Sequence, residues 1–257
     1  MEHSNLALVF AGLVVGLLVG LSGVGGGTLM TPLLLYLGFP PVTAVGTDLV
    51  YAAVTKASGA FLHSRRHNVV WPLVGWLLLG SLPGSILTLV VWQRLIVPHS
   101  VQATTVKVLL GLILIGTGIL VLLRLSLKKP DTASPSVPTQ PPRKLLTILL
   151  GAVLGILVTL TSAGAGAVGA AALSLLFPRL SASKIIGSDL AHAVPLTLTA
   201  GLAHLATGQV DLWAVVWLSL GSIPALAVGS WLAPKVPERI LKPVMGTGLA
   251  LLGLTLV

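Results

Sequence analysis

Residues 22–41 read SGVGGGTLMTPLLLYLGFPP, and residues 161–178 read TSAGAGAVGAAALSLLFP. Each stretch opens with a run of small residues and continues as an apolar piece of about a dozen residues that ends at proline. As a helix, twelve residues reach about 18 Å, whereas the hydrocarbon core of a bilayer is about 30 Å thick. Neither piece can therefore cross a membrane alone.

The rest of the chain has the composition of a helical membrane protein. Its 257 residues are 55% hydrophobic and 8% charged, with a mean hydropathy of +1.02. Soluble domains carry about 25% charged residues. Most apolar runs approach or exceed the roughly 18 residues of a transmembrane helix. The 29 glycines and 17 prolines also suit membrane helices, which tolerate both residues. The predicted fold class is an all-α polytopic membrane protein.

Charge and motifs exclude several other classes. Membrane loops rich in Lys and Arg explain the net charge of +9, so no nucleic-acid partner is expected. The absence of cysteine excludes disulfides and thiolate metal sites. The Walker loop, H-E-x-x-H and G-x-S-x-G motifs are absent, so we predict no enzyme, no metal site and no cofactor. The acidic start, MEHSN, predicts no cleavable signal peptide.

The chain is internally duplicated. Sliding it by 141 positions aligns residues 23–83 with 164–224 at 17 identities in 61 positions, and these include the rare pair Asp48 and Asp189. Between the copies lies a proline-rich stretch that predicts an exposed linker. We therefore divide the chain into an N-terminal repeat (1–125), a linker (126–144) and a C-terminal repeat (145–257).

The short apolar pieces allow two topologies. If each continues the preceding helix, every repeat crosses four times and the repeats are parallel. If each turns back as a re-entrant half-helix hairpin, every repeat has three transmembrane helices and the repeats are inverted. Four crossings divide fourteen basic loop residues seven and seven, whereas three crossings leave only Arg94 and Lys107 opposite the linker. The positive-inside rule favours three crossings, with a cytoplasmic linker and both termini outside. The twelve basic residues on the linker side are Arg65, Arg66, Arg124, Lys128, Lys129, Arg143, Lys144, Arg179, Lys184, Lys235, Arg239 and Lys242.

The small-residue breaks are the first candidates for a binding site. Backbone that leaves helical geometry inside a membrane must be buried in protein or line a wet cavity. The half-helices that open near Thr28 and Ala167 present unpaired amides and a positive dipole end, which suit a small anion. The alternative is that Gly and Ala only permit close helix packing. The candidate residues are Ser22, Gly23, Val24, Gly25, Gly26, Gly27 and Thr28, with Ser162, Ala163, Gly164, Ala165 and Gly166.

Polar residues inside predicted membrane helices extend this site. Lys56 is the candidate counter-charge for the anion, or it extends to the cytoplasmic interface. Asp48 and Asp189 follow a hydroxyl residue in GTDL and GSDL, which favours a structural anchor over proton coupling. His192 occupies the position of Tyr51 in the other repeat and is a ligand, a proton carrier or a packing residue. Further hydroxyl donors precede helix prolines at Ser81 and Ser222.

These motifs in this order give the chain a family resemblance. A duplicated chain with G-x-GGG at 23–27, a short apolar helix ended by Gly and Pro, GTDL at 46–49 and GSLPG at 80–84 resembles the sulfite exporter TauE/SafE-like family. The resemblance covers nearly the whole chain outside the linker. It implies a secondary transporter for sulfite, organosulfonates such as sulfoacetate, or related small anions. The second repeat departs from the pattern with GAGAV at 164–168, so unequal contributions to substrate contact are expected.

We therefore predict a plasma-membrane exporter that binds a small organosulfur oxyanion at the midplane, between the glycine-rich breaks. Rocking of one repeat against the other would alternate access. The alternatives are an anion channel and a membrane-embedded binding or assembly component for a sulfur-metabolism enzyme. The expected partners are the anion and the lipid bilayer. The oligomeric state stays open, with a homodimer among the options.

Overall fold

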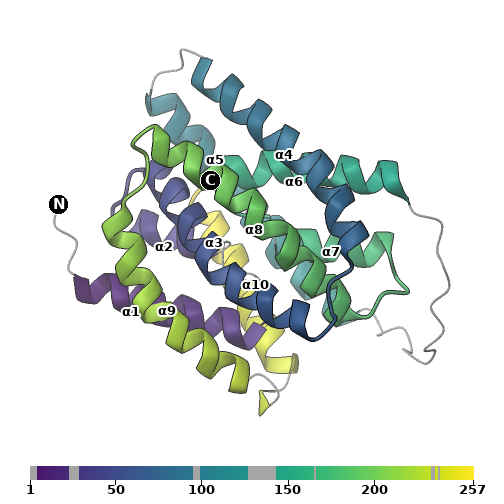
Figure 1. Ribbon diagram of the computed structural model, residues 1–257. Coiled ribbons are helices and arrows are strands. Elements are labelled where there is room, and N and C mark those ends of the chain that lie inside the picture. Colours follow the sequence, from purple (N-terminus) through teal and green to yellow (C-terminus); the bar gives the residue numbers. More distant parts are fainter. Residues whose placement is uncertain are drawn as a thin grey trace.

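The computed structural model describes residues 5–22, 29–94, 99–126, 143–164, 166–232, 235–236 and 238–257. Within these ranges the regular secondary structure is entirely helical, which confirms the all-α class (Figure 1). The helices are α1 (Asn5–Ser22), α2 (Met30–Tyr36), α3 (Pro41–Arg65), α4 (Trp71–Arg94), α5 (His99–Ser126), α6 (Lys144–Thr161), α7 (Ala167–Leu176), α8 (Ala182–Ala206), α9 (Leu212–Leu232) and α10 (Glu238–Leu254).

Five of the described helices are long and apolar enough to cross a membrane: α4, α5, α6, α8 and α9. Large apolar side chains such as Leu6, Leu79 and Trp231 lie exposed on the outside of the bundle. A soluble protein would bury such residues, whereas lipid solvates them. The chain is therefore a multi-pass membrane protein.

Helix pairing joins the two repeats at every principal contact. Helix α1 packs chiefly on α9, α6 on α4, α3 on α8, and α5 on α10. Figure 1 shows the α1–α9 pair at one side of the molecule and α4 beside α6 at another. Helices α1 and α6 are equivalent in the two repeats, and so are α4 and α9. The α1–α9 contact is therefore equivalent to the α6–α4 contact. The repeats are thus interlocked rather than separate bundles.

Glycines make two of these crossings close. A Cβ atom added at Gly12 would lie 3.1 Å from the Cα of Leu218, and one added at Gly151 would lie 3.1 Å from the Cα of Leu77. Leu77 and Leu218 are equivalent residues in the duplication. Both helix pairs therefore rely on small residues for backbone approach, as membrane helices commonly do.

The GTDL and GSDL motifs hold the central helix pair in place. Helices α3 and α8 run antiparallel, because a Cβ at Gly46 would lie 3.0 Å from the Cβ of His204, near the other end of α8. The hydroxyl of Thr47 accepts a hydrogen bond from the amide of Asp211 at 3.0 Å. In the other repeat Ser188 accepts one from Val70 at 2.9 Å. Each hydroxyl thus caps the chain that leads into α9 or α4 of the opposite repeat.

The short apolar pieces form α2 and α7, of 7 and 10 residues. Helix α7 begins at Ala167, as the sequence predicts. The start of α1 lies beside the start of α9, because Trp213 Nε1 donates a hydrogen bond to Asn5 at 3.0 Å. The end of α2 lies beside the end of α10, because the hydroxyls of Tyr36 and Thr255 are hydrogen-bonded. Neither short helix can cross a membrane alone, because about 15 Å is the most that ten residues reach.

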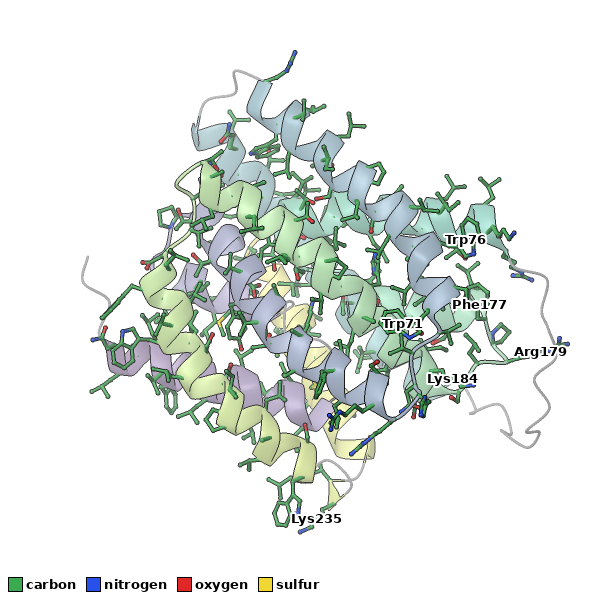
Figure 2. All side chains as sticks on the ribbon, viewed as in Figure 1. Trp71, Trp76, Phe177, Arg179, Lys184 and Lys235 are labelled. Atoms are coloured by element: carbon green, nitrogen blue, oxygen red, sulfur yellow. The ribbon has the colours of Figure 1, made fainter. Side chains whose placement is uncertain are left out.

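The outer ends of α6 and α7 lie at the start of α4. The Lys144 ammonium lies 5.0 Å from the centre of the Trp76 ring, and Phe177 packs in a cluster with Leu73. Figure 2 shows Trp71, Phe177, Arg179 and Lys184 in this part of the molecule. The predicted linker, except for its flanking residues, lies outside the described residues. The repeat boundaries and the orientation of the repeats in a membrane stay predictions.

Candidate substrate site

Three ionisable side chains are buried where α3 crosses α8. Asp48 and Lys56 come from α3 and Asp189 from α8, and their exposed fractions are 0%, 3% and 2%. The spacing of eight residues between Asp48 and Lys56 places them two turns apart on nearly one face of α3. Buried ionised groups require partners, since removing a charge from water is costly.

Lys56 supplies a positive charge to both carboxylates. Its ammonium interacts electrostatically with Asp189 and with Asp48, one from each repeat. In the second repeat the equivalent position is Thr197, which bonds within its own helix to Ala193 at 2.8 Å. The cluster therefore has one lysine for two aspartates and lacks the symmetry of the scaffold around it.

Each aspartate also holds the start of a short helix. Asp48 Oδ2 accepts hydrogen bonds from the Thr31 amide at 3.1 Å and from the Thr31 hydroxyl at 2.5 Å. The Asp189 carboxylate accepts one from the backbone of Gly166, immediately before α7. This is the arrangement that the anchor interpretation of the two aspartates expects. The Thr31 amide therefore donates to the Asp48 carboxylate and not to a bound anion.

Two further polar pairs cross between the repeats. His192 Nε2 lies 2.9 Å from the Ser81 hydroxyl of α4, and the equivalent Tyr51 hydroxyl lies beside Ser222 of α9. Lys56 acts electrostatically on His192, and Asp48 acts on Tyr51. The structure thus brings the candidate residues Lys56, His192, Ser81 and Ser222 into one cluster and adds Tyr51.

The second break also reaches this cluster. Ser162 ends α6 in a left-handed conformation with φ of 56°, and Gly164 and Gly166 have φ of 118° and 125°. The Ser162 hydroxyl lies beside the Asp48 carboxylate. Ala163 is buried, packing against α5 and α10 residues instead. A break that begins in one repeat therefore contacts the charged residue of the other.

The first break lies mostly outside the described residues. Ser22 ends α1, and Gly23, Val24, Gly25, Gly26, Gly27 and Thr28 are not among the described residues, nor is Ala165 of the second break. Thr31 is a site residue that the sequence analysis missed. Its only sequence signal is a buried hydroxyl in the first turn of a short helix, and its partner depends on how the break folds back.

Comparison with known proteins shows the family to which the chain belongs. The family model for "Sulfite exporter TauE/SafE" matches residues 8–256. The chain belongs to the sulfite exporter TauE/SafE family. It is 39% identical to "Probable membrane transporter protein YjnA" of Bacillus subtilis (strain 168), over 98% of this chain and 100% of that relative. It is 26% identical to "Probable membrane transporter protein YdhB" of the same organism, over 98% of this chain and 100% of that relative. No solved structure matches.

Membership of the TauE/SafE family confirms the resemblance found in the sequence. The chain is a multi-pass membrane transporter and not an enzyme. In this TauE/SafE transporter the buried charges lie where the two repeats meet.

Proposed function

We propose that the protein is a secondary transporter that exports small organosulfur oxyanions, such as sulfite or sulfoacetate, across the plasma membrane. The bound anion lies beside the Lys56 ammonium, between the two helix breaks. The observation that carries this proposal is a lysine buried to 3% exposure where the repeats meet. A buried ammonium without a structural or functional role would be selected against, because its desolvation is costly. The family description supplies the sulfur chemistry.

Hydroxyl groups around Lys56 complete a site for an oxyanion. An oxyanion accepts several hydrogen bonds, and charged acceptors form stronger bonds than neutral ones. The buried hydroxyl of Ser162 lies beside Asp48 and that of Ser222 beside Tyr51, and neither makes a close hydrogen bond within the part of the chain that the structure describes. These hydroxyls can donate to the oxygens of a bound sulfite or sulfonate, while Lys56 balances its charge.

Alternating access then involves two lobes, each of which contains helices from both repeats. One lobe is α1, α2, α3 and α9; the other is α6, α7, α8 and α4. Within each lobe, α9 packs on α1 and α3, and α4 packs on α6 and α8. Rocking of one whole repeat against the other would break these contacts, so we propose that the lobes move instead of the repeats. The charged cluster lies at α3 and α8, the contact between the lobes.

The proposed orientation has the linker in the cytoplasm and both termini outside. Its support is that basic residues lie at one end of the bundle. Arg65 and Arg66 lie at the end of α3, and the segment from Arg179 to Lys184 leads into α8. The hydrogen bond from the Val70 amide to Ser188 holds the chain after α3 close to the start of α8. Lys144, the last residue of the linker, lies on Trp76 near the same helix start. Clustered positive charge marks a cytoplasmic side.

A thermal-shift panel on the purified protein tests the proposal. Sulfite, sulfate, thiosulfate and short-chain sulfonates are compared, since a ligand at a hundred times its Kd adds about 2.7 kcal/mol of stability. We expect sulfite or a sulfonate to raise the melting temperature. Saturable counterflow of the same anion in proteoliposomes should follow. Flux that never saturates would indicate a channel, and no flux with the protein alone would indicate a binding or assembly component.

Lys56→Ala and the matched control Lys107→Ala separate the site from general surface charge. Lys107 lies exposed on α5, away from the cluster. Removing a hydrogen bond to a charged group costs about 1.5–3 kcal/mol, so we expect Lys56→Ala to weaken anion binding about ten- to hundredfold. Expression should stay near normal. Unchanged affinity in Lys56→Ala would remove this residue from the site.

A further inference from the structure

We infer that the anion binds together with a proton, which the Asp48–Asp189 pair takes up, so that anion and proton cross the membrane in the same direction. This inference rests on the proposed function. Its starting point is the charge of the cluster, in which one lysine lies with two carboxylates from opposite repeats. With all three groups ionised the cluster carries one net negative charge, which repels an anion.

The ionisable groups that face this cluster are few. Tyr51 and His192 are the others, and both are buried. The surrounding helices α1, α7 and α9 carry no ionisable side chain, and neither does the segment 23–28. Helices α2, α4 and α6 carry theirs at their ends, as Tyr36, Arg94 and Lys144, and α5 carries Lys107, which is exposed. No other charge within the described residues therefore compensates the two carboxylates.

The number of protons follows from the charge of a buried site. In low dielectric a net charge is costly, so the resting cluster is neutral when the two carboxylates hold one proton between them. A bound monovalent oxyanion restores one negative charge. A second proton, taken from the aqueous side to which the site is open, neutralises it again. Each anion is thus accompanied by one proton.

The carboxylates can hold these protons without losing their structural bonds. Asp48 Oδ2 is bonded to Thr31, and Asp189 accepts from Gly166. In both residues the buried Oδ1 makes no close hydrogen bond to a described residue, and the Ser162 hydroxyl is the group that lies beside the Asp48 carboxylate. One oxygen of each carboxylate therefore holds the start of a short helix, and the other is available to bind a proton.

The other two ionisable groups are poorer acceptors for this proton. A proton on His192 would create a second positive charge close to the Lys56 ammonium, which would repel it. Tyr51 is protonated already at neutral pH and has no proton to gain. The carboxylates on α3 and α8 also belong to different lobes and both interact with Lys56, so their protonation would be sensitive to how the lobes close.

The test measures methanesulfonate binding to the purified wild-type protein across roughly pH 5 to 9, because this anion stays monovalent throughout and its own titration adds no proton. If one proton binds with each anion, the affinity for methanesulfonate falls about tenfold per pH unit. The fall begins above the pH at which the two carboxylates of the anion-free protein lose their second proton. Proton uptake on binding, measured in weak buffer, should approach one per anion.

The variants Asp48→Asn/Asp189→Asn and Asp211→Asn sharpen the test. Asparagine keeps an acceptor oxygen for Thr31 or Gly166 but binds no proton. The double variant should therefore bind methanesulfonate equally at all pH values, and more tightly than wild type at high pH. Asp211→Asn is the matched control: this carboxylate only caps α9, accepting from Ala214 at 2.9 Å, and should keep the wild-type slope.

The outcomes separate this inference from the proposed function. Failure of wild type to bind methanesulfonate at any pH would count against the oxyanion site itself. Saturable binding with a flat pH profile and no proton uptake would overturn the proton inference alone. So would a folded double variant with no affinity at any pH, because the aspartates would then be needed as acceptors. Should the double variant not fold, Asp189→Asn alone must lower proton uptake, and an unchanged value would refute the inference.

Discussion

Replacing Gly155 with alanine should separate α6 from α4 and destabilise the protein. A Cβ at Gly155 would lie 2.8 Å from the Cα of Ser81 and 2.9 Å from its carbonyl carbon, and closer still to the carbonyl oxygen. Ordinary carbon contacts begin near 3.4 Å. The two helices must therefore move apart by more than half an ångström along a crossing that has no flexible side chain to yield.

The magnitude follows from this overlap. Overpacking a well-packed core by a methyl group costs about 1–3 kcal/mol. The matched control is Gly75→Ala in α4, where an added Cβ meets nothing within 4 Å. That change should stabilise by about 0.4–1 kcal/mol through chain entropy. The two variants should thus differ by roughly 1.4–4 kcal/mol, or on the order of 3–16 °C in melting temperature.

The assay is thermal unfolding in detergent, followed by tryptophan fluorescence, with both variants purified identically. Gly155→Ala should also shift Ser81, whose hydroxyl lies 2.9 Å from His192 Nε2, and so weaken binding of the anion that stabilises wild type. Equal melting temperatures for Gly155→Ala and Gly75→Ala would refute the reasoning, because they would show that the crossing yields without cost.

Two further predictions concern the scaffold and its movement. Ser188→Ala removes the acceptor of the Val70 amide and should cost about 1 kcal/mol in chemical unfolding. Thr105→Ala removes an exposed hydrogen bond to Val101 within α5 and should cost less than half of that. In the cysteine-free chain, spin labels at exposed Phe10 and Leu220 should keep their distance when the anion binds, since α1 and α9 share a lobe. Labels at Phe10 and Leu79, in different lobes, should change distance; the opposite result would mean that whole repeats move.

The sequence predicts the helices well because each apolar run is long and uninterrupted. It places the start of α7 at Ala167, and it identifies Asp48, Lys56, Asp189 and His192 as buried candidates. Isolated charges in an apolar chain are conspicuous, since a membrane tolerates them only at functional or structural sites. These residues could therefore be found without knowing which helices pack together.

The pairing of helices could not be predicted in the same way. The pattern in α1 shows glycines at intervals of four, but nothing in it indicates that its partner is α9 rather than α4. Which helix packs on α1 depends on the complementary shapes of the two helix surfaces, and amino-acid composition does not reveal these shapes. For the same reason the Thr31–Asp48 bond was missed, because residues 17 positions apart meet only through the fold of the break between them.

The duplication is preserved where it builds the scaffold and broken where the charge lies. Gly46 and Gly187 receive the opposite repeat's loop in the same way, and Thr47 and Ser188 cap equivalent amides. At the centre the equivalence ends. Lys56 faces no second lysine, because Thr197 takes the equivalent place, and His192 replaces Tyr51. In the proposed mechanism, a single cation at the contact between the two lobes lets one anion bind from either side and leave again.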